Sequence, residues 1–270
     1  MSSYWFIHLL LSLVIGGAFI AFCSLAAEFF GTEFGGLIAG LPSTVVITLL
    51  FVALTESPSR AVEETTIIPV ILGLNCLFLV TYALSAAGGA VLALAAALVT
   101  WLALAVLAVL YAPRHLATSL LLLVVGFGVA YVLLNRCVRP ATAAGSPVRP
   151  GALQVLARAA FGGAVIALGV WLSHTGGPIV GGVAAVFPAA GVSTLVIVSW
   201  SRGVRFSLGL LQPMMVSGSI TILVYAAVVR YTYLPLGVFG GTMTALVAAG
   251  GSAYVLYRWR QPRGRGREKQ

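Results

Sequence analysis

The feature that most constrains this chain is a hydrophobic segment that occurs twice in the sequence. Residues 16–21 align on residues 162–167, and the agreement continues without a gap at a fixed offset of 146 positions (162 minus 16). The aligned identities that follow are Gly31 on Gly177, Gly35-Gly36 on Gly181-Gly182, Ala39 on Ala185, Pro42 on Pro188, Thr48-Leu49 on Thr194-Leu195 and Val52 on Val198. Such agreement is hard to obtain from composition alone, so it predicts an internal duplication. A duplicated hydrophobic unit is the usual construction of a membrane transporter.

The composition indicates a membrane protein. Of the 270 residues, 60% are hydrophobic and 8% are charged, whereas an average soluble domain is roughly 25% charged. The apolar runs are continuous and about 20 residues long, as a helix must be to cross a bilayer core of roughly 30 Å. An outer-membrane barrel would instead alternate apolar and polar residues in segments of about 10. The sequence therefore predicts an all-α integral membrane protein.

About nine transmembrane helices are expected along the chain. The predicted spans cover residues 5–27, 34–55, 62–85, 89–111, 116–134, 152–173, 178–200, 204–229 and 234–257. The segment between the fifth and sixth spans is rich in arginine, proline and small residues, which is typical of a linker.

The nine spans divide into two units of four around one unpaired span. Residues 1–111 form the first predicted repeat and residues 152–257 the second. Residues 112–151 hold linker helix 5 and a cytoplasmic loop, and residues 258–270 form a basic cytoplasmic tail. The chain would cross the membrane five times between a position in the first repeat and the matching position in the second. Because five is odd, the two repeats would enter the membrane from opposite sides. The expected fold is thus a 4+1+4 arrangement of two inverted four-helix repeats, which gives alternating access its two related states.

The basic residues predict the orientation of the chain. With nine spans, one membrane face receives 11 of the 15 lysines and arginines, the opposite face receives three, and Arg158 lies within a helix. Cytoplasmic loops carry the excess of positive charge. We therefore expect a multi-pass protein of the cell membrane with its N-terminus outside and its C-terminus in the cytoplasm.

Prolines occur at matched positions in the two repeats: Pro42 aligns on Pro188, and Pro69 on Pro213 after a shift of two residues. A proline within a helix removes a backbone donor and frees a carbonyl, which another group must satisfy. Broken helices at corresponding places point to a binding site at mid-membrane, and kinking for packing alone is the alternative. The residues expected to bind substrate are Pro42, Thr44, Asn75, Arg158, Pro188, Thr194, Gln212 and Ser217. The amides among them are also explained as interhelical hydrogen bonders.

Ionisable groups within or beside the spans are few. Arg158 could counter an anionic substrate or extend to the headgroups. Glu63 and Glu64 open the third span, where carboxylates suit the helix dipole, and coupling to protons or cations is the alternative role. His174 aligns on Glu28 at a helix end, and both are expected near the membrane interface. Most of the tryptophans are expected to be interfacial anchors.

The second repeat resembles a family of small membrane proteins. Residues 181–188, Gly-Gly-Val-Ala-Ala-Val-Phe-Pro, followed by Ser201-Arg202-Gly203, resemble the four-helix GlpM-type proteins, whose second helix carries a glycine and then Phe-Pro and ends at an Arg-Gly turn. The first repeat has Leu41-Pro42 instead of Phe-Pro. The resemblance implies two such units fused through one helix. Small units duplicated into inverted halves are also similar in architecture to the drug/metabolite transporter superfamily.

We therefore expect a secondary transporter of a small molecule or lipid-linked anion that works by alternating access. The alternatives are an ion channel, or a non-transporting membrane subunit of an envelope-synthesis complex. No enzymatic activity, catalytic residue, metal or cofactor is expected, because the chain has three histidines, no aspartate and no paired His or Cys spacing. The expected partners are membrane lipids and the substrate, and not nucleic acid. A homodimer is one alternative for the oligomeric state.

Overall fold

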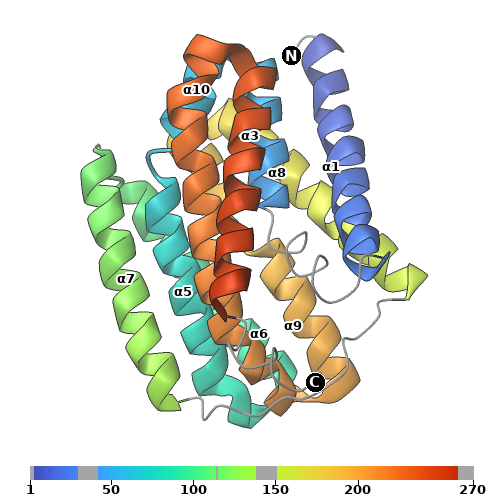
Figure 1. Ribbon diagram of the computed structural model, residues 1–270, viewed down its shortest axis with the longest axis vertical. Helices are drawn as coiled ribbons and strands as arrows, with labels where there is room; N and C mark the ends of the chain where they lie inside the picture. Colours follow the sequence, from blue (N-terminus) through green and yellow to red (C-terminus); the bar gives the residue numbers. More distant parts are fainter. Residues whose placement is uncertain (1–2, 30–41, 114, 138–150, 261–270) are drawn as a thin grey trace, which may run out of the picture.

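A computed structural model describes residues 3–29, 42–113, 115–137 and 151–260 (Figure 1). All regular elements in these ranges are helices, and no strand occurs among them. The all-α prediction is confirmed. The first part of the predicted second span (residues 34–41), most of the linker (138–150) and the end of the basic tail (261–270) lie outside the described residues.

The first half of the chain forms α1, Ser3–Phe29, followed after the undescribed segment by α3, Ser43–Thr55. A short helix α4, Pro58–Glu64, then precedes α5, Ile68–Ser85, and α6, Ala90–Leu110. The predicted third span thus consists of two helices. Ser57 begins α4, because its hydroxyl accepts a hydrogen bond from the Arg60 amide and Pro58 occupies the first helical position.

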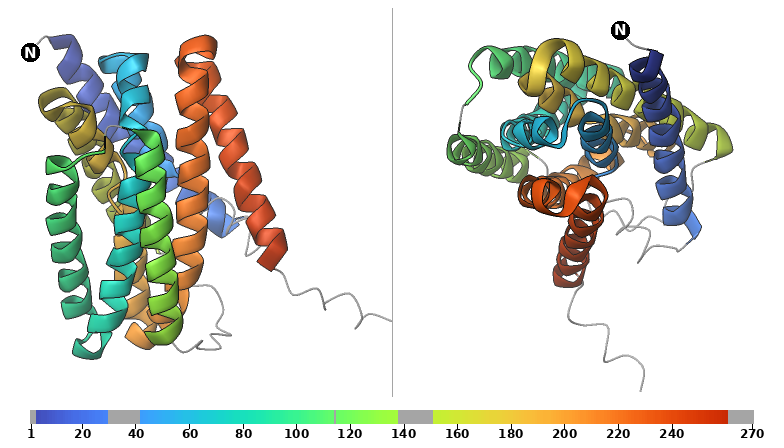
Figure 2. Two further views of the ribbon diagram at one scale, coloured as in Figure 1. Left: turned by 90° about the vertical axis from the view of Figure 1, so that its left-hand side faces the viewer. Right: turned by 90° about the horizontal axis from the view of Figure 1, so that it is seen from above.

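The second half begins with α7, Leu116–Cys137, and continues with α8, Ala152–Ala185, α9, Ala189–Arg202, and α10, Val204–Arg260. Gly177 interrupts α8 and Gly237 interrupts α10, each with a positive φ, 89° and 72° respectively. At about 1.5 Å per residue, an unbroken helix of the length of α10 would far exceed a bilayer core. The chain instead turns back at Gly237, and the two parts of α10 lie side by side (Figures 1 and 2).

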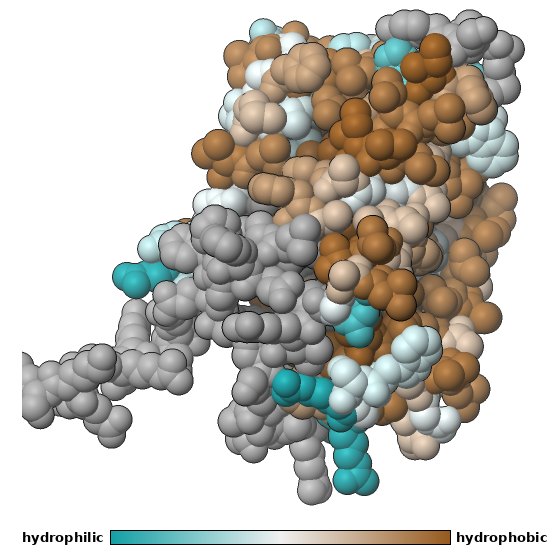
Figure 3. Space-filling view, turned by 90° about the vertical axis from the view of Figure 1, so that its right-hand side faces the viewer, coloured by the Kyte–Doolittle hydropathy of each residue, from teal (hydrophilic) through white to brown (hydrophobic). Residues whose placement is uncertain are grey.

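Among the described residues, six helices are long and apolar enough to cross a membrane. Their outward faces are hydrophobic, with many exposed leucines, valines and aromatic side chains on α1, α6, α7 and α10. Figure 3 shows apolar side chains over much of one face of the molecule. Such a surface suits lipid rather than water, so the helices indicate a membrane protein.

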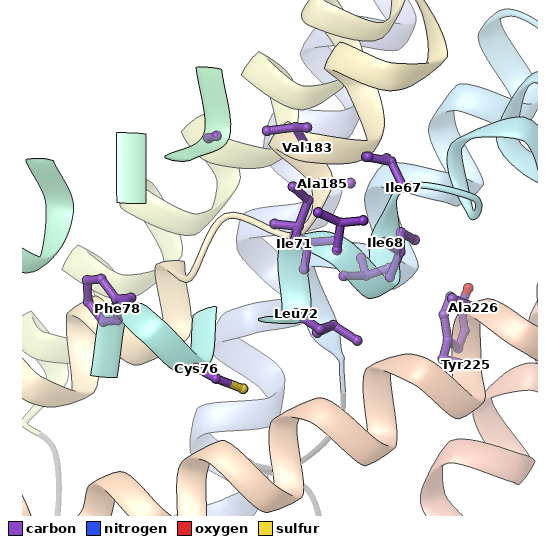
Figure 4. Close-up of a cluster of buried hydrophobic side chains, with 14 of the residues drawn as sticks. Ile67, Ile68, Ile71, Leu72, Cys76, Phe78, Val183, Ala185, Tyr225 and Ala226 are labelled. Atoms are coloured by element: carbon purple, nitrogen blue, oxygen red, sulfur yellow. The ribbon is translucent and has the colours of Figure 1, made fainter. Parts of the chain in front are cut away.

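The buried core is built mainly from α3, α5 and α10, and α6, α7, α8 and α9 add side chains to it. Its fully buried side chains include Ile68 and Ile71 of α5, and Tyr225 of α10, with Val183 and Ala185 of α8 packed nearby (Figure 4). Pro69 lies at the start of α5 and not in its interior. A proline in the first helical turn removes an amide that has no partner there anyway. Pro69 thus follows the break between α4 and α5 that divides the predicted third span.

Two glycine pairs allow α1 and α8 to cross at close range. A Cβ atom built on Gly163 would lie 2.5 Å from the carbonyl oxygen of Leu13 and 3.2 Å from the amide nitrogen of Gly17. A Cβ on Gly17 would lie 3.0 Å from the carbonyl oxygen of Ala159. The two helices run antiparallel, because Trp5 at the start of α1 contacts the His174 ring, at 4.6 Å between ring centroids.

We predict that Gly163→Ala destabilises the protein by roughly 1–3 kcal/mol, the usual cost of overpacking, because the new methyl group would meet backbone atoms that cannot rotate away. Thermal unfolding in detergent measures the effect. Gly128→Ala on α7 is the matched control, since a Cβ there meets nothing within 4 Å and alanine favours a helix. Equal melting temperatures for the two variants would contradict the close crossing.

Candidate functional site

Pro42 and Pro188 occupy the same position, at the starts of two helices. Each proline directly precedes a helix, α3 or α9, and their backbone angles are closely similar: φ −77° and ψ 57° for Pro42, φ −76° and ψ 47° for Pro188. In the second half of the chain, α8 ends at Ala185 and α9 begins at Ala189. A proline here leaves carbonyl groups of the preceding turn without helical amide partners.

Asn75 of α5 satisfies one of these freed carbonyls. Its side-chain nitrogen donates to the carbonyl oxygen of Val186 at 3.0 Å, and its side-chain oxygen accepts from the Trp101 indole of α6 at 2.7 Å. Trp101 also meets the Phe187 ring edge-on, at 5.1 Å between centroids. Trp101 is buried within α6 and is therefore not an interfacial anchor. Asn75 thus connects the first half of the chain to the break in the second.

Arg158 and Thr194 lie together near the same break. The Arg158 guanidinium donates to the Thr194 hydroxyl at 3.3 Å, and its Nε is buried without a hydrogen-bond partner among the described residues. Thr44 and Ser217 are partly buried on α3 and α10. Gln212 lies elsewhere: it donates to Asn135 of α7 at 3.0 Å, on an exposed part of the surface. The structure thus brings Asn75, Arg158, Pro188 and Thr194 to the α8–α9 break and places Gln212 against α7.

The two carboxylates proposed for coupling differ sharply. Glu63 is exposed, whereas Glu64 at the end of α4 is fully buried. The Ser173 hydroxyl of α8 donates to Oε1 of Glu64, while Oε2 has no hydrogen-bond partner among the described residues. Gly181 and Gly182 of α8 lie so close to α4 that a Cβ on Gly182 would be 2.8 Å from the carbonyl oxygen of Glu64.

Further polar contacts surround Glu64. Arg60, one turn earlier on α4, donates to the carbonyl oxygen of Ser173 at 3.4 Å. His174 contacts Glu56 at 2.6 Å, between Nδ1 and Oε1. Together, Glu56, Arg60 and Glu64 contact the two consecutive residues Ser173 and His174 of α8. We call this contact between α4, with the turn before it, and α8 the α4–α8 seam.

Sequence reasoning missed most of this seam. Neither Ser173 nor Arg60 was predicted to belong to a site. His174 was expected near the membrane interface, and its contact with Glu56 was not predicted. The available signal was weak: Arg60 and Glu64 lie four residues apart, on one face of a helix, and Gly177-Pro178 marks an interruption near Ser173. Among the described residues, no group of three or more His, Cys, Asp or Glu could hold a metal ion.

The seam favours a neutral Glu64. Burial raises the pKa of the Glu64 carboxyl to about 8, and the Ser173 hydroxyl and the Arg60 charge offset only part of this effect. An ionised carboxylate has acceptor sites on both oxygens, and only Oε1 is bonded here. The arrangement can therefore hold and release a proton near neutral pH.

We predict that the stability of the folded protein falls as the pH rises from about 5 to about 8, because the folded state then holds a proton that the unfolded state, with a pKa near 4.5, has lost. The slope contributed by Glu64 is at most about 1.4 kcal/mol per pH unit. Glu64→Gln should remove this contribution and Glu63→Gln should not. Thermal unfolding in detergent across this pH range measures it, and equal slopes for the wild type and Glu64→Gln would contradict the buried carboxyl.

Comparison with known proteins gives one partial similarity. Residues 9–115 match the model of a family described as "Protein of unknown function (DUF3147)". The match covers less than half of the chain and falls almost entirely within the first predicted repeat. No curated protein and no solved structure matches the chain.

Proposed function

We propose that this protein is a secondary transporter that works by alternating access between two inverted four-helix repeats in a 4+1+4 arrangement. In this proposal, α1 to α6 form the first repeat, α7 is the linker helix, and α8 to α10 form the second repeat, divided at Gly177 and Gly237. The proposed substrate is a small molecule or lipid-linked anion. The resemblance to GlpM-type proteins and the similarity of architecture to the drug/metabolite transporter superfamily stay predictions.

The observation that carries the proposal is the reciprocity of the α1–α8 crossing. Adding 146 to the number of an α1 residue, and subtracting 146 from the number of the α8 residue that it contacts, gives another pair of residues that are in contact at the same crossing. Two pairs of contacts are related in this way: Gly16 with Ile166 and Gly162 with Ile20, and Gly17 with the carbonyl of Ala159 and Gly163 with the carbonyl of Leu13. Reciprocal contacts are the mark of a two-fold axis.

The direction of the helices supports inversion over a parallel repeat. Since α1 and α8 run antiparallel, a two-fold axis relating them would lie across the helices and turn one repeat upside down. Inverted repeats of this kind related by an axis in the membrane plane are typical of secondary transporters. The family match at residues 9–115 is compatible with a first repeat that is a unit of its own.

The matched helix breaks suggest where a substrate would bind. Arg158 places a positive charge beside the α8–α9 break, and Thr194 adds a hydroxyl. Pro42 precedes α3 with backbone angles close to those of Pro188, and the residues before it lie outside the described part of the chain. Discontinuous helices near the midplane commonly form transporter sites, where helix N-termini favour anionic groups. An anionic substrate fits this combination best.

The inverted arrangement predicts opposite membrane faces for Ser59 and Arg205, both exposed. In a background without Cys23, Cys76 and Cys137, a cysteine at position 59 should react with an impermeant maleimide on intact cells. A cysteine at position 205 should react only after the membrane is opened. Labelling of both positions from the same side would end the proposal of inverted repeats.

Transport itself predicts counterflow, the uptake of labelled substrate driven by unlabelled substrate inside proteoliposomes. Small carboxylates, phosphate esters and lipid phosphates would first be screened for thermal stabilisation of the purified protein, and a stabilising compound would then be used in the uptake assay. Arg158→Gln should abolish the stabilisation, and the exposed Arg205→Gln should preserve it.

Other results would favour the other functions. Ion currents in planar bilayers without counterflow would indicate a channel. Stable co-purification with a partner, without stabilisation by any compound, would indicate a membrane subunit.

A further inference from the structure

The Glu64 carboxyl lies at a junction between the two halves of the molecule. Its helix, α4, packs on α3, α8 and α10. On α8, Glu64 bonds Ser173 before the interruption at Gly177 and lies against Gly181 and Gly182 after it. The segment 178–185 has a break at each end, at Gly177 and before Pro188. Glu64 therefore contacts α8 on both sides of the interruption at Gly177.

The neighbouring cations do not form ion pairs with Glu64 among the described residues. Arg60 donates to the Ser173 carbonyl. Arg230 of α10 donates to the Val62 carbonyl and to the hydroxyls of two threonines, Thr65 and Thr66, at 2.9–3.3 Å. Both arginines therefore bond neutral oxygens.

The remaining titratable groups lie on the elements packed around Glu64. Glu56, at the end of α3, contacts His174 of α8, and Glu63 on α4 itself is exposed. On α10, the Tyr233 hydroxyl bonds Thr242 at 3.0 Å, and the buried Tyr225 hydroxyl has no hydrogen-bond partner among the described residues. An ionised Glu64 would thus have no cation in an ion pair with it among the described residues, and burial favours the neutral form of the carboxyl.

Loss of the proton would change the hydrogen bonding of the seam at Ser173. A carboxylate at position 64 would attract Arg60, one helical turn away, because opposite charges at this spacing interact. Arg60 would then leave the Ser173 carbonyl, just before the interruption at Gly177. The new charge would also require water, which Gly181 and Gly182 exclude while they lie against α4.

We propose that Glu64 is a proton-binding site that controls the α4–α8 seam: the neutral carboxyl holds the seam closed, and release of its proton to water opens it. The opening of the seam is independent of the proposed function, and only its link to substrate movement rests on that function. As a coupling site, Glu64 would make opening of this end of the molecule depend on the proton gradient.

Distances across the seam test this proposal directly. Spin labels would be placed on Ser59→Cys of α4 and Ile179→Cys of α8, both exposed positions, in the cysteine-free background and in lipid nanodiscs. Pulsed electron spin resonance at pH 5.5 and pH 9.5 should give a single short distance at the lower pH and an added longer distance at the higher pH. The midpoint is expected near pH 8, where Glu64 titrates.

Three variants separate Glu64 from its neighbours. Glu64→Gln should keep the short distance at both pH values, because the amide cannot ionise. Ser173→Ala should move the midpoint to higher pH, because it removes a donor that stabilises the carboxylate. Glu63→Gln should leave the response unchanged. A pH response that persists in Glu64→Gln, or a wild type that shows none, would overturn the proposal.

A sodium control distinguishes a proton from another small cation. At fixed pH, replacing sodium chloride by choline chloride should leave the distances unchanged, and a change that depends on sodium would overturn the assignment to a proton. The distances are independent of counterflow. If the seam opens with pH but the protein shows no counterflow, the transporter proposal is refuted and the proton site stands. If the protein shows counterflow but the seam does not respond to pH, the proton site is refuted and the transporter proposal stands.

Discussion

The backbone-to-backbone contact at the crossing of α1 and α8 is the constraint on which the rest of the structure depends. In lipid, apolar side chains gain little by leaving their surroundings, so helices associate through close packing, and small residues permit the closest approach. Gly17 and Gly163 bring two backbones together where any Cβ would intrude. The crossing joins the first helix of the chain to a helix of its second half, and it therefore constrains how the helices that follow α1 and α8 can meet.

A second constraint follows from the absence of water in the membrane interior. Every interruption of a helix leaves backbone groups that protein atoms must satisfy. Asn75 bonds the Val186 carbonyl at the break before Pro188, and Trp101 holds the Asn75 side chain in place. This pair explains why a polar amide and a tryptophan lie in the middle of apolar helices. The same network ties α5 and α6 to the break in the other half of the chain.

Much of the helical framework could be predicted from hydropathy, because the long helices are apolar runs ended by glycine, proline or polar residues. The candidate site was less predictable. Glu63 and Glu64 are consecutive residues with the same chemistry, and only the packing of α8 on α4 leaves one exposed and buries the other. Gln212 and Asn75 are both amides within apolar helices, yet one faces the linker helix α7 and the other faces a broken helix. Interhelical partners far apart in sequence decide these roles, and a single sequence does not specify them.

The sequence by itself determined that this is a helical protein suited to a membrane, and it predicted an internal duplication at an offset of 146 positions. The helical and apolar character follows from the composition and from the hydropathy of successive segments. The predicted duplication follows from comparing two segments of the sequence residue by residue. Only the tertiary structure decided that Ser173, from the second half, lies against Glu64 from the first. The physical reason is that a carboxyl acquires its charge state from the atoms around it, and these atoms come from helices more than 100 residues apart.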